Sequence, residues 1–515
     1  MNNTPAAPQP DATTLTATTP ADRRPGRRRV GLLRQRRALA ATGIAVVAGG
    51  VLVTGLTASA GPSAAAQQAD RPAACVPYDP TKPQPPAQAP APTSVSTVEQ
   101  VYYCIFDNYY GAARLDDRPL LQYAFQAVVR ELRKRGADRP NAVLPALTGD
   151  RDKDWQLFAR RFQEVLDAVP DDQALRSSLA VAAIQGMFAA LHDNHAGYSP
   201  GDPGAPQDAH PWGLGIGLNR LLPPAETAPD FTGPLFLTTV GAGTPAAKAK
   251  LRPGDVIETV NGVPVFTNGR LNPGVVDSLH PAYPRRTPVT LTVRRPATGR
   301  TLHVRVTPGP LPAQPQPHVT ATLVAGGIAH IRFDAFYPGV AQEALKAIAG
   351  LQATTKLTGI IFDLRGNHGG VGEEGNMLMG AFVHGAAAVS FCDADGTCHP
   401  QPVNDNTPLL HLPMVTLTDD GCASACEMFA TGVKDLHLGT LVGTRTAGVN
   451  SGPAHLYALN DSRLIRLPSQ HVIGANGEII DGVGVPPDYY APLTAADAST
   501  GKDPALDKAK AILRS

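Results

Sequence analysis

The 515-residue sequence has no excess of either charge, because 45 Lys and Arg residues face 44 Asp and Glu residues. Nucleic-acid-binding domains carry a clustered basic excess, so this balance argues against a nucleic-acid partner. The sequence has only one long hydrophobic run, near its N-terminus, which excludes a polytopic membrane protein. With 43% apolar residues the chain is not disordered throughout. Its length corresponds to roughly two to four domains of about 100–200 residues each.

The spacings typical of zinc sites are also missing. Neither Cys-x-x-Cys nor His-Glu-x-x-His occurs, so zinc is a weak alternative for the six cysteines. Cys392 and Cys398 bracket an Asp-Gly turn, which favours a disulfide between them. A Cys75–Cys104 bond could staple the chain to the first helix, while Cys422 and Cys426 either pair or stay free. All six cysteines follow the hydrophobic run, and disulfides persist outside the cytosol.

The N-terminal region predicts export. Residues 1–37 lack periodicity, end in an arginine-rich stretch and are expected to be disordered; an uncharged apolar run follows at residues 38–60. A basic flank before an apolar run is typical of an export signal. Ala58-Ser59-Ala60 fits a cleavage site, but about 20 apolar residues can also remain as a transmembrane anchor. Both alternatives place the protein in the cell envelope outside the cytoplasm, either secreted or held by one N-terminal helix. Residues 61–94 are proline-rich and form an extended spacer.

Three modules and a tail are expected after the spacer. Apolar residues at three-to-four spacing predict a helical domain over residues 95–205. Short strands and turns follow over residues 206–312, and α/β signals over residues 320–495. Residues 496–515 form a C-terminal helix or tail. The fold class is therefore multidomain α+β.

The second module resembles a PDZ domain. The segment Leu251-Arg252-Pro253-Gly254-Asp255-Val256-Ile257-Glu258-Thr259-Val260-Asn261-Gly262 matches that family's L-x-x-G-D-x-I-x-x-V-N-G pattern. The glycine-rich segment before it lies where PDZ domains have their carboxylate-binding loop. Backbone N–H groups of such a loop can hold a peptide carboxylate, while the exposed strand edge accepts the peptide as an extra strand. The residues expected to bind peptide are Gly213, Leu214, Gly215 and Ile216.

In the third module, a buried-type strand at residues 413–418 runs into Gly421-Cys422-Ala423-Ser424-Ala425-Cys426-Glu427 and a helix. A serine at the start of a helix, directly after a strand, gains exposure and a favourable position for developing negative charge. Serine is also an ordinary helix cap, so this pattern alone does not identify a nucleophile.

Four motifs in this order resemble the S41 peptidases, which include the C-terminal (tail-specific) processing peptidases and the tricorn-type peptidases. They are Phe-Asp-Leu-Arg-Gly-Asn-x-Gly-Gly, Ala-Ser-Ala-Cys-Glu, Leu-Val-Gly-Thr-Arg-Thr-Ala-Gly and Asp-Gly-Val-Gly-Val-Pro-Pro-Asp. The resemblance implies a crotonase-like ββα core after a helical and a PDZ segment. It makes Ser424 the nucleophile, with Cys426 in place of the family's second serine. It places the oxyanion hole at the backbone N–H groups of Gly369, Gly370 and Ala425.

The general base of the processing peptidases is missing. Their motif G-x-x-x-x-G-K-G has lysine where this chain has Val449, and Lys434 lies outside the family position. The tricorn-type branch uses a histidine from the segment before the PDZ domain, and Leu191-His192-Asp193-Asn194-His195 matches its L-x-D-x-H signature. His195 is therefore the candidate base, and neutral imidazole suits that task. The alternative is a histidine with a structural hydrogen bond. The residues that could orient His195 are Asp193, Glu427 and Asp481.

The sequence thus predicts an exported serine endopeptidase or processing peptidase that cuts polypeptides, unfolded chains or C-terminal tails, captured partly by the PDZ domain. Acyl-enzyme chemistry needs no metal or nucleotide, and no cofactor is expected. The first alternative is a pseudo-peptidase that binds polypeptide C-termini without cleavage, because the family lysine is Val449. The second is a carrier of apolar ligands, since retinoid-binding repeats share the core fold.

Overall fold

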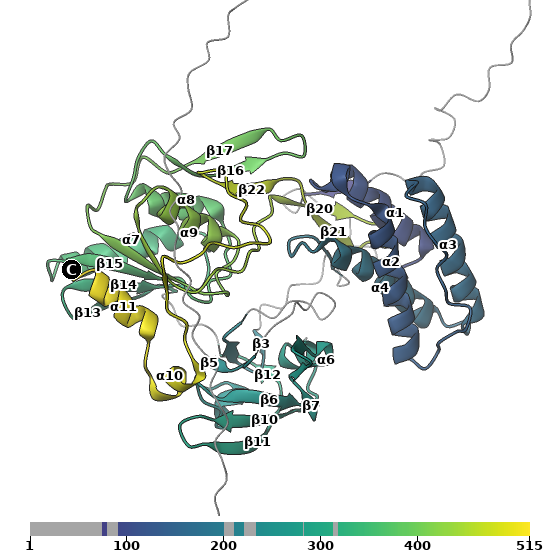
Figure 1. Cartoon of the computed structure of the whole chain (residues 1–515), viewed down its shortest axis with the longest axis horizontal. Helices are drawn as coiled ribbons and strands as arrows, with labels where there is room; N and C mark the ends of the chain where they lie inside the picture. The colour runs from purple at the N-terminus through teal and green to yellow at the C-terminus, as the bar shows by residue number, and fades with distance from the viewer. Residues whose placement is uncertain are drawn as a thin grey trace, which may run out of the picture. The chain divides into compact units, whose positions relative to one another are not determined.

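The computed structural model describes residues 75–79, 91–199, 211–220, 233–281, 283–312 and 318–514. All of them belong to one unit of the chain, residues 68–515 (Figure 1). The expected disordered N-terminus, the signal or anchor at 38–60 and most of the spacer lie outside the described residues. The chain has a helical region, a β-rich region and a mixed region in that order, in agreement with the predicted multidomain α+β class.

Four α-helices form the first region: α1 (Val95–Asn108), α2 (Asp117–Lys134), α3 (Arg151–Ala168) and α4 (Gln173–Leu191). The last three begin at Asp116, Asp150 and Asp172, whose carboxylates accept backbone N–H groups of the first turn. The apolar faces of the four helices meet in one buried cluster. Within the described ranges, α4 alone is long and apolar enough to cross a membrane, and 56% of its apolar window is buried in the molecule.

The second region is β-rich and has its own hydrophobic core. Its main sheet has the order β11-β10-β6-β7, and the pairs β12–β3, β4–β5 and β8–β9 surround it. The strands are β3 (Trp212–Gly213), β4 (Ile216–Leu218), β5 (Leu237–Val240), β6 (Val256–Val260), β7 (Val263–Pro264), β8 (Phe266–Thr267), β9 (Arg270–Leu271), β10 (Val289–Arg295), β11 (Arg300–Val306) and β12 (Gly309–Pro310). Two short helices, α5 (Pro245–Lys248) and α6 (Pro273–Leu279), complete it.

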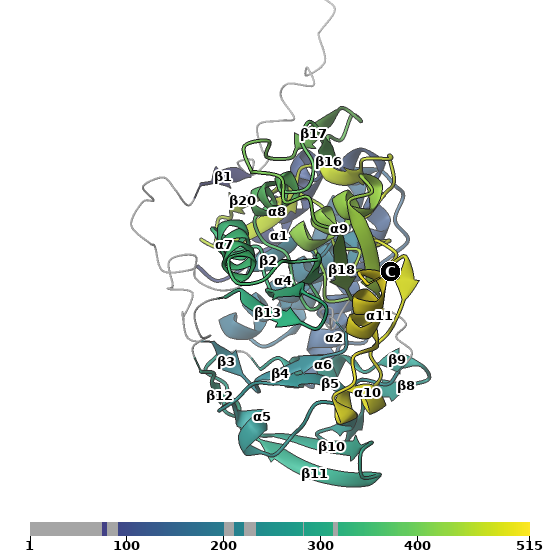
Figure 2. The ribbon, with the colours of Figure 1, turned by 90° about the vertical axis from the view of Figure 1, so that its left-hand side faces the viewer.

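The third region is built on a six-stranded sheet of order β13-β14-β15-β18-β19-β23, parallel except for the edge strand β13. Its strands are β13 (Thr320–Val324), β14 (Ile328–Arg332), β15 (Gly359–Asp363), β18 (Met414–Thr418), β19 (Gly439–Gly443) and β23 (Tyr489–Tyr490). Successive side chains along each strand point to opposite faces of this sheet. Helices α7 (Val340–Gln352), α8 (Gly372–Gly380) and α9 (Ala425–Asp435) share a core with one face, and α11 (Pro504–Ile512) packs on the other, beside β18 (Figure 2). A short helix, α10 (Ala495–Thr500), precedes α11.

A hairpin from the third region packs on the helices of the first region and contributes to their core. Strands β20 (Ala454–Ala458) and β21 (Leu464–Pro468) pair in a sheet of order β1-β20-β21-β2, with β1 (Val76–Tyr78) and β2 (Gly197–Ser199) from the N-terminal side. Four apolar residues of the hairpin region belong to the buried cluster of the helices: Tyr457, Leu459, Ile465 and Leu467. The hairpin therefore joins the helical region to the core that follows the PDZ-like region.

All three disulfides that the sequence allowed are present, so none of the six cysteines is free. Cys75–Cys104 ties the segment of β1 to α1. Cys392–Cys398 closes the hairpin of β16 (Ala387–Cys392) and β17 (Cys398–Pro402), which forms a sheet with β22 (His471–Gly474). Cys422–Cys426 spans the residues on either side of Ser424.

Candidate active site

Ser424 lies at the junction between β18 and α9, at the end of a turn formed by residues 419–424, here called the nucleophile turn. Its backbone has φ 57° and ψ −122°, outside the regions that residues other than glycine ordinarily occupy. Such a conformation costs on the order of 1–3 kcal/mol and persists only where the surroundings fix it. A sharp, strained strand-to-helix turn is also what exposes the nucleophilic serine of α/β-hydrolases. Ser424, which is half-buried, thus lies at the kind of turn that presents a nucleophilic serine.

The loop between β19 and β20, residues 444–453, supports the nucleophile turn from one side and is called the support loop. Ser424 donates its N–H to the carbonyl oxygen of Val449 at 2.8 Å, and Ala447 donates to that of Cys422 at 2.9 Å. From the other side, Ala423 donates to the carbonyl oxygen of Asn367 at 3.0 Å. Val449, which stands at the lysine position of the processing peptidases, therefore lies directly beside Ser424.

Glu427 joins the support loop to α9 through its carboxylate, which is fully buried. The carboxylate accepts hydrogen bonds from the Thr446 hydroxyl at 2.6 Å and from the N–H groups of Gly448 and Val449 at 2.7 Å. A weaker bond of 3.2 Å comes from the N–H of Ser424. Burial raises the pKa of Glu427 to about 7, against the lowering effect of these donors. Among the hydrogen bonds of the described residues, Glu427 holds the backbone around Ser424 and makes none to His195.

His195 reaches Ser424 from the turn after α4, residues 192–196, here called the histidine turn. His192 ends α4 in the left-handed region at φ 52°, which reverses the chain direction. His195 Nε2 then lies 3.3 Å from Ser424 Oγ, so the structure brings together the two residues that the sequence paired. Burial lowers the pKa of His195; Asp193 opposes this shift and Arg466 adds to it. Its other ring nitrogen, Nδ1, is buried and has no hydrogen-bond partner among the described residues.

Asp193 links the histidine turn to the support loop. Its Oδ1 accepts the backbone N–H of His195 at 2.8 Å and the hydroxyl of Ser451 at 2.7 Å. Its Oδ2 accepts the hydroxyl of Tyr109 at 3.1 Å. Asp193 thus contacts the backbone of His195 and not its ring. The sequence did not predict Tyr109 or Ser451, because their spacing to Asp193 along the chain carries no local signal.

Asp481, the third residue considered for orienting His195, lies next to this group. It accepts the N–H of Asn450 at 2.8 Å and the hydroxyl of Tyr110 at 3.4 Å. Burial first, and then the charge of Asp193, raise its pKa, while the two hydrogen bonds oppose the rise. Lys434 is at the far end of α9, about 15 Å along the helix from Ser424 at 1.5 Å per residue. Its ammonium lies 3.7 Å from the carboxylate of Glu478.

The glycine turn after β15 is packed against the nucleophile. A Cβ atom on Gly369 would lie 2.7 Å from the Cβ of Ser424 and 2.9 Å from the backbone nitrogen of Ala425, so only glycine fits there. Gly369 donates its own N–H to Asn367 Oδ1 at 2.9 Å. The N–H groups of Gly370 and Ala425 donate to no acceptor in the described part of the chain. Of the three predicted oxyanion donors, these two are available for a ligand.

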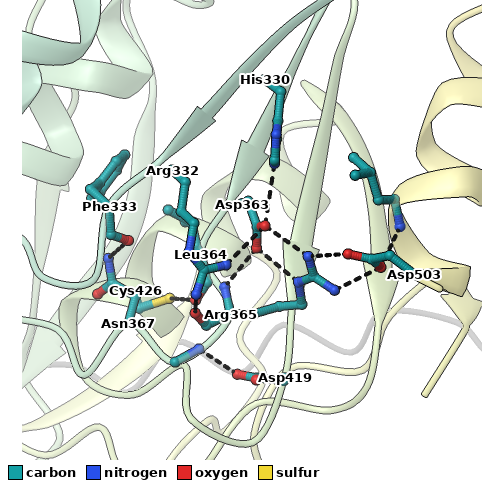
Figure 3. Close-up of polar contacts among 12 residues, drawn as sticks. His330, Arg332, Phe333, Asp363, Leu364, Arg365, Asn367, Asp419, Cys426 and Asp503 are labelled. Atoms are coloured by element: carbon teal, nitrogen blue, oxygen red, sulfur yellow. Dashed lines mark hydrogen bonds and ion pairs between the residues drawn. The ribbon is translucent and has the colours of Figure 1, made fainter. Parts of the chain in front are cut away.

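A buried charge cluster fixes this glycine turn (Figure 3). Asp363, 1% exposed, receives two hydrogen bonds of 2.7 and 2.8 Å from Arg365 and an ion pair of 2.9 Å from Arg332. Burial alone would raise the pKa of Asp363, but its bonds to Arg365 and His330 hold it well below its usual range. Arg365 also pairs with Asp503, the residue that caps α11. The Asp-Leu-Arg-Gly-Asn stretch of the sequence contains this signal, although its charged residues were not predicted as part of the site.

The predicted carboxylate loop of the PDZ-like region, residues 213–216, has backbone N–H groups that are available to a ligand. The carbonyl oxygens of Leu214 and Gly215 accept N–H groups from Ala246 at 2.9 Å and Gly241 at 3.0 Å. The N–H groups of Leu214 and Gly215 have no acceptor within the described ranges. A Cβ on Gly215 would lie 2.3 Å from Thr244 Cβ, which explains the glycine. Next to the loop, β4 pairs with β5 along one edge and with no other described strand.

The end of β4 points toward the nucleophile turn. Arg220, two residues after β4, forms an ion pair of 3.8 Å with Asp420, which stands four residues before Ser424. Burial and the neighbouring Asp419 raise the pKa of Asp420 to about 7, and Arg220 opposes this rise. The strand edge of the PDZ-like region is therefore connected to the turn that carries Ser424.

Comparisons with known proteins find relatives for the second and third regions of the chain. Peptidase family S41 matches residues 327–491, and the PDZ domain family matches residues 236–295. The carboxy-terminal-processing protease of Bartonella bacilliformis is 26% identical over 356 residues, which cover 66% of this chain and 75% of that protein. The carboxy-terminal processing protease CtpB of Bacillus subtilis is 23% identical over 348 residues, covering 66% of this chain and 68% of the relative.

Two solved structures are similar over most of the chain. The photosystem II D1 C-terminal processing protease is 22% identical with a TM-score of 0.42, covering 71% of this chain and 92% of the other. Mature CPAF is 14% identical with a TM-score of 0.48, covering 82% of this chain and 96% of the other. Together with the two family matches, the named relatives confirm the resemblance drawn from the sequence motifs.

Proposed function

The chain belongs to peptidase family S41 and carries a PDZ domain, and from this premise we propose that it is an exported serine peptidase with Ser424 as nucleophile and His195 as general base. The observation that carries the proposal is the 3.3 Å contact between His195 Nε2 and Ser424 Oγ at a strained strand-to-helix turn. A nucleophile and base within hydrogen-bonding reach are the basis of covalent catalysis by serine.

The proposed chemistry is acyl transfer. His195 Nε2 takes the proton of Ser424 as Oγ attacks the carbonyl carbon of the scissile peptide bond, and the negative charge moves to the carbonyl oxygen. The N–H groups of Gly370 and Ala425 are the donors for that oxygen. The proton then passes from His195 to the leaving amine, and a water molecule attacks the acyl-enzyme with His195 again as base. Because burial lowers its pKa, the imidazole is neutral at neutral pH and ready to accept the proton.

The PDZ domain is proposed to present the substrate. A peptide carboxylate held by the N–H groups of Leu214 and Gly215 lies at the start of β4, so a peptide pairing with that strand runs antiparallel to it. Its upstream residues then pass the end of β4 at Arg220, which contacts the nucleophile turn through Asp420. This direction supports cleavage upstream of a captured C-terminus and makes polypeptide tails the proposed substrate class.

Export is the second part of the proposal. It rests on the arginine-flanked apolar run at residues 38–60, which lies outside the described residues, and on the three disulfides after it. Disulfides of this number are typical of proteins outside the cytosol. A reporter enzyme that is active only in the cytosol, fused after Thr93, is expected to be inactive; full reporter activity would contradict export.

Labelling by a fluorophosphonate tests the catalytic pair. The wild type is expected to be labelled at Ser424 and to cleave casein, whereas Ser424→Ala and His195→Gln do neither. Ser96→Ala and His303→Gln, which change an exposed serine of α1 and a histidine of β11, serve as matched controls and keep wild-type rates. Casein cleavage at the normal rate after His195→Gln would remove His195 from the mechanism.

Peptide capture has a separate test. Peptides with a free apolar C-terminus are expected to bind at least about tenfold more tightly than their C-terminal amides, because the amide loses charge-assisted hydrogen bonds. Equal binding of acid and amide would reduce the PDZ domain to a spacer.

A binding protein without peptidase activity is the competing function. Val449 in place of the family lysine favours it, and so does the unpartnered Nδ1 of His195, since an unoriented imidazole is a poor base. This alternative predicts tight binding of peptide acids with no fluorophosphonate labelling. The labelling experiment therefore separates the two functions.

A further inference from the structure

The disulfide between Cys422 and Cys426 encloses the candidate nucleophile. The two cysteines stand two residues before and two residues after Ser424, and both are fully buried. The processing peptidases that this motif resembles have serine at the second position, so the bond is a feature of this chain's own sequence. A buried cross-link centred on the reactive residue calls for a role beyond general stability.

The bond restricts the part of the backbone that is strained. Ser424 has φ 57°, and relaxing it to a negative φ requires Ala423 and Ala425 to change direction as well. Both ends of the cross-linked segment are anchored: Cys422 donates its N–H to Asp419 at 3.0 Å, and Cys426 donates to Ala423 at 3.1 Å. With the sulfur atoms joined, the segment has few alternative conformations. With two separate thiols, α9 can begin earlier and Ser424 can leave the strained region.

We propose that the Cys422–Cys426 disulfide is a positioning element of the active site, which holds Ser424 in its reactive conformation so that full turnover requires oxidation of this pair. The inference rests on the proposed role of Ser424. Oxidation joins the two sulfur atoms and releases two protons and two electrons, which a disulfide-bonded thiol oxidoreductase accepts as its own disulfide is reduced. The peptidase is then slow in a reducing compartment and gains activity after export.

The test replaces the bond with the family's own residue in the full chain. Cys422→Ala combined with Cys426→Ser is expected to lower kcat for casein about tenfold with KM unchanged, since only the population of the reactive Ser424 conformation falls. Fluorophosphonate labelling is expected to slow by the same factor. Cys392→Ser combined with Cys398→Ser is the matched control, because it removes a disulfide of similar loop length, six residues apart instead of four. The control is expected to lose a similar amount of thermal stability and to keep its kcat.

The possible outcomes distinguish this inference from the proposed function. Wild-type kcat in the Cys422→Ala/Cys426→Ser variant, or an equal loss in the control, overturns the positioning role. A wild type that is labelled no faster than Ser424→Ala overturns the proposed function instead. Should the variant fail to fold, the Cys392→Ser/Cys398→Ser protein is treated with a dithiol, and opening of the Cys422–Cys426 bond is followed by mass spectrometry. Labelling that falls as this bond opens and recovers on reoxidation supports the proposal, whereas unchanged labelling of protein with the bond open overturns it.

Discussion

The nucleophile turn and the histidine turn are held in different ways. Around Ser424, the Glu427 carboxylate, the Val449 carbonyl and a disulfide all act on the residue or on its immediate neighbours. Apart from the 3.3 Å contact of its Nε2 with Ser424, His195 is held by its backbone, which donates to Asp193 and accepts from Arg466 at 2.7 Å. Its ring Nδ1 has no partner among the described residues.

This difference shows which of the two residues, Ser424 or His195, has its conformation fixed by its own region. The conformation of Ser424 is fixed by groups of the third region itself, without a contribution from the helices of the first region. His195 comes from another region, which the hydrogen bond between Asp193 and Ser451 links to the support loop. The conformation of Ser424 is therefore fixed in advance, whereas the position of His195 depends on how the two regions meet.

The largest expected effect comes from breaking the pair itself. Ser424→Ala and His195→Gln should each lower kcat for casein by at least about a thousandfold, and the double variant should be little worse than either single one, because residues that act as one unit are not additive. Steady-state kinetics of the three variants measure this. Additive losses would show that the two side chains act independently.

The second effect concerns the pH dependence of stability. Glu427, which contacts Ser424, and His195 are expected to change the free energy of unfolding with pH in opposite directions. Burial raises the pKa of Glu427 from 4.5 to about 7, so the folded protein binds this proton more tightly than the unfolded chain does. The contribution of Glu427 to the free energy of unfolding is therefore full below about pH 4.5 and falls by about 3 kcal/mol as pH rises to 7. Glu427→Gln should remove this fall.

His195 provides the contrast. Its pKa is lowered, so its contribution to stability is present above about pH 6.5 and is lost as the pH falls. His195→Gln should therefore improve relative stability at acid pH, the reverse of Glu427→Gln. Urea unfolding of the wild type and both variants between pH 4.5 and 7.5 measures these slopes. Parallel curves for all three proteins would contradict the assignment of either shift.

A smaller effect is expected from the contact between the histidine turn and the support loop. Asp193→Asn replaces an acceptor of three hydrogen bonds by an amide that cannot accept all of them, and should lower kcat about tenfold with little change in KM. Asp461→Asn is the control, since Asp461 is also an almost fully buried aspartate, 1% exposed, but lies away from the pair and bonds to Thr93 and Arg463. Equal losses of kcat in both variants would reduce Asp193 to a general structural role.

The smallest effect is expected at the connection between the PDZ domain and the nucleophile turn. Arg220 and Asp420 are partly exposed, 36% and 27%, and pairs of this kind contribute about 0–1 kcal/mol. Arg220→Gln should raise KM at most about fivefold for long peptides with a free apolar C-terminus and leave short peptides unaffected. Arg294→Gln, which removes the exposed pair with Glu258 elsewhere in the PDZ domain, is expected to change neither value.

Local patterns in the sequence singled out Ser424, His195 and the glycine-rich loops, because each belongs to a short motif with fixed spacing, and the structure places the side chains of Ser424 and His195 3.3 Å apart. The helical region and the strand before Ser424 were also readable from apolar spacing and an apolar run. The contacts of Tyr109 and Ser451 with Asp193 were not, since they join residues separated by 84 and 258 positions. The same limit applies to the oxyanion donors, because the bond from Gly369 to Asn367 that occupies one of them depends on a side-chain conformation.

The hairpin β20–β21 has a consequence for the order of events during synthesis. The sheet that it forms with β2 brings together parts of the chain that are made far apart in time: the hydroxyl of Tyr198 bonds to Asp461, 263 positions later. Until the ribosome has passed the hairpin, the helices lack four apolar residues of their core. The helical region that carries His195 can therefore complete its core only after the third region, with Ser424, has been translated. Such long-range pairing is intrinsically slow. The nascent chain therefore cannot bring His195 to Ser424 before most of it has emerged from the ribosome.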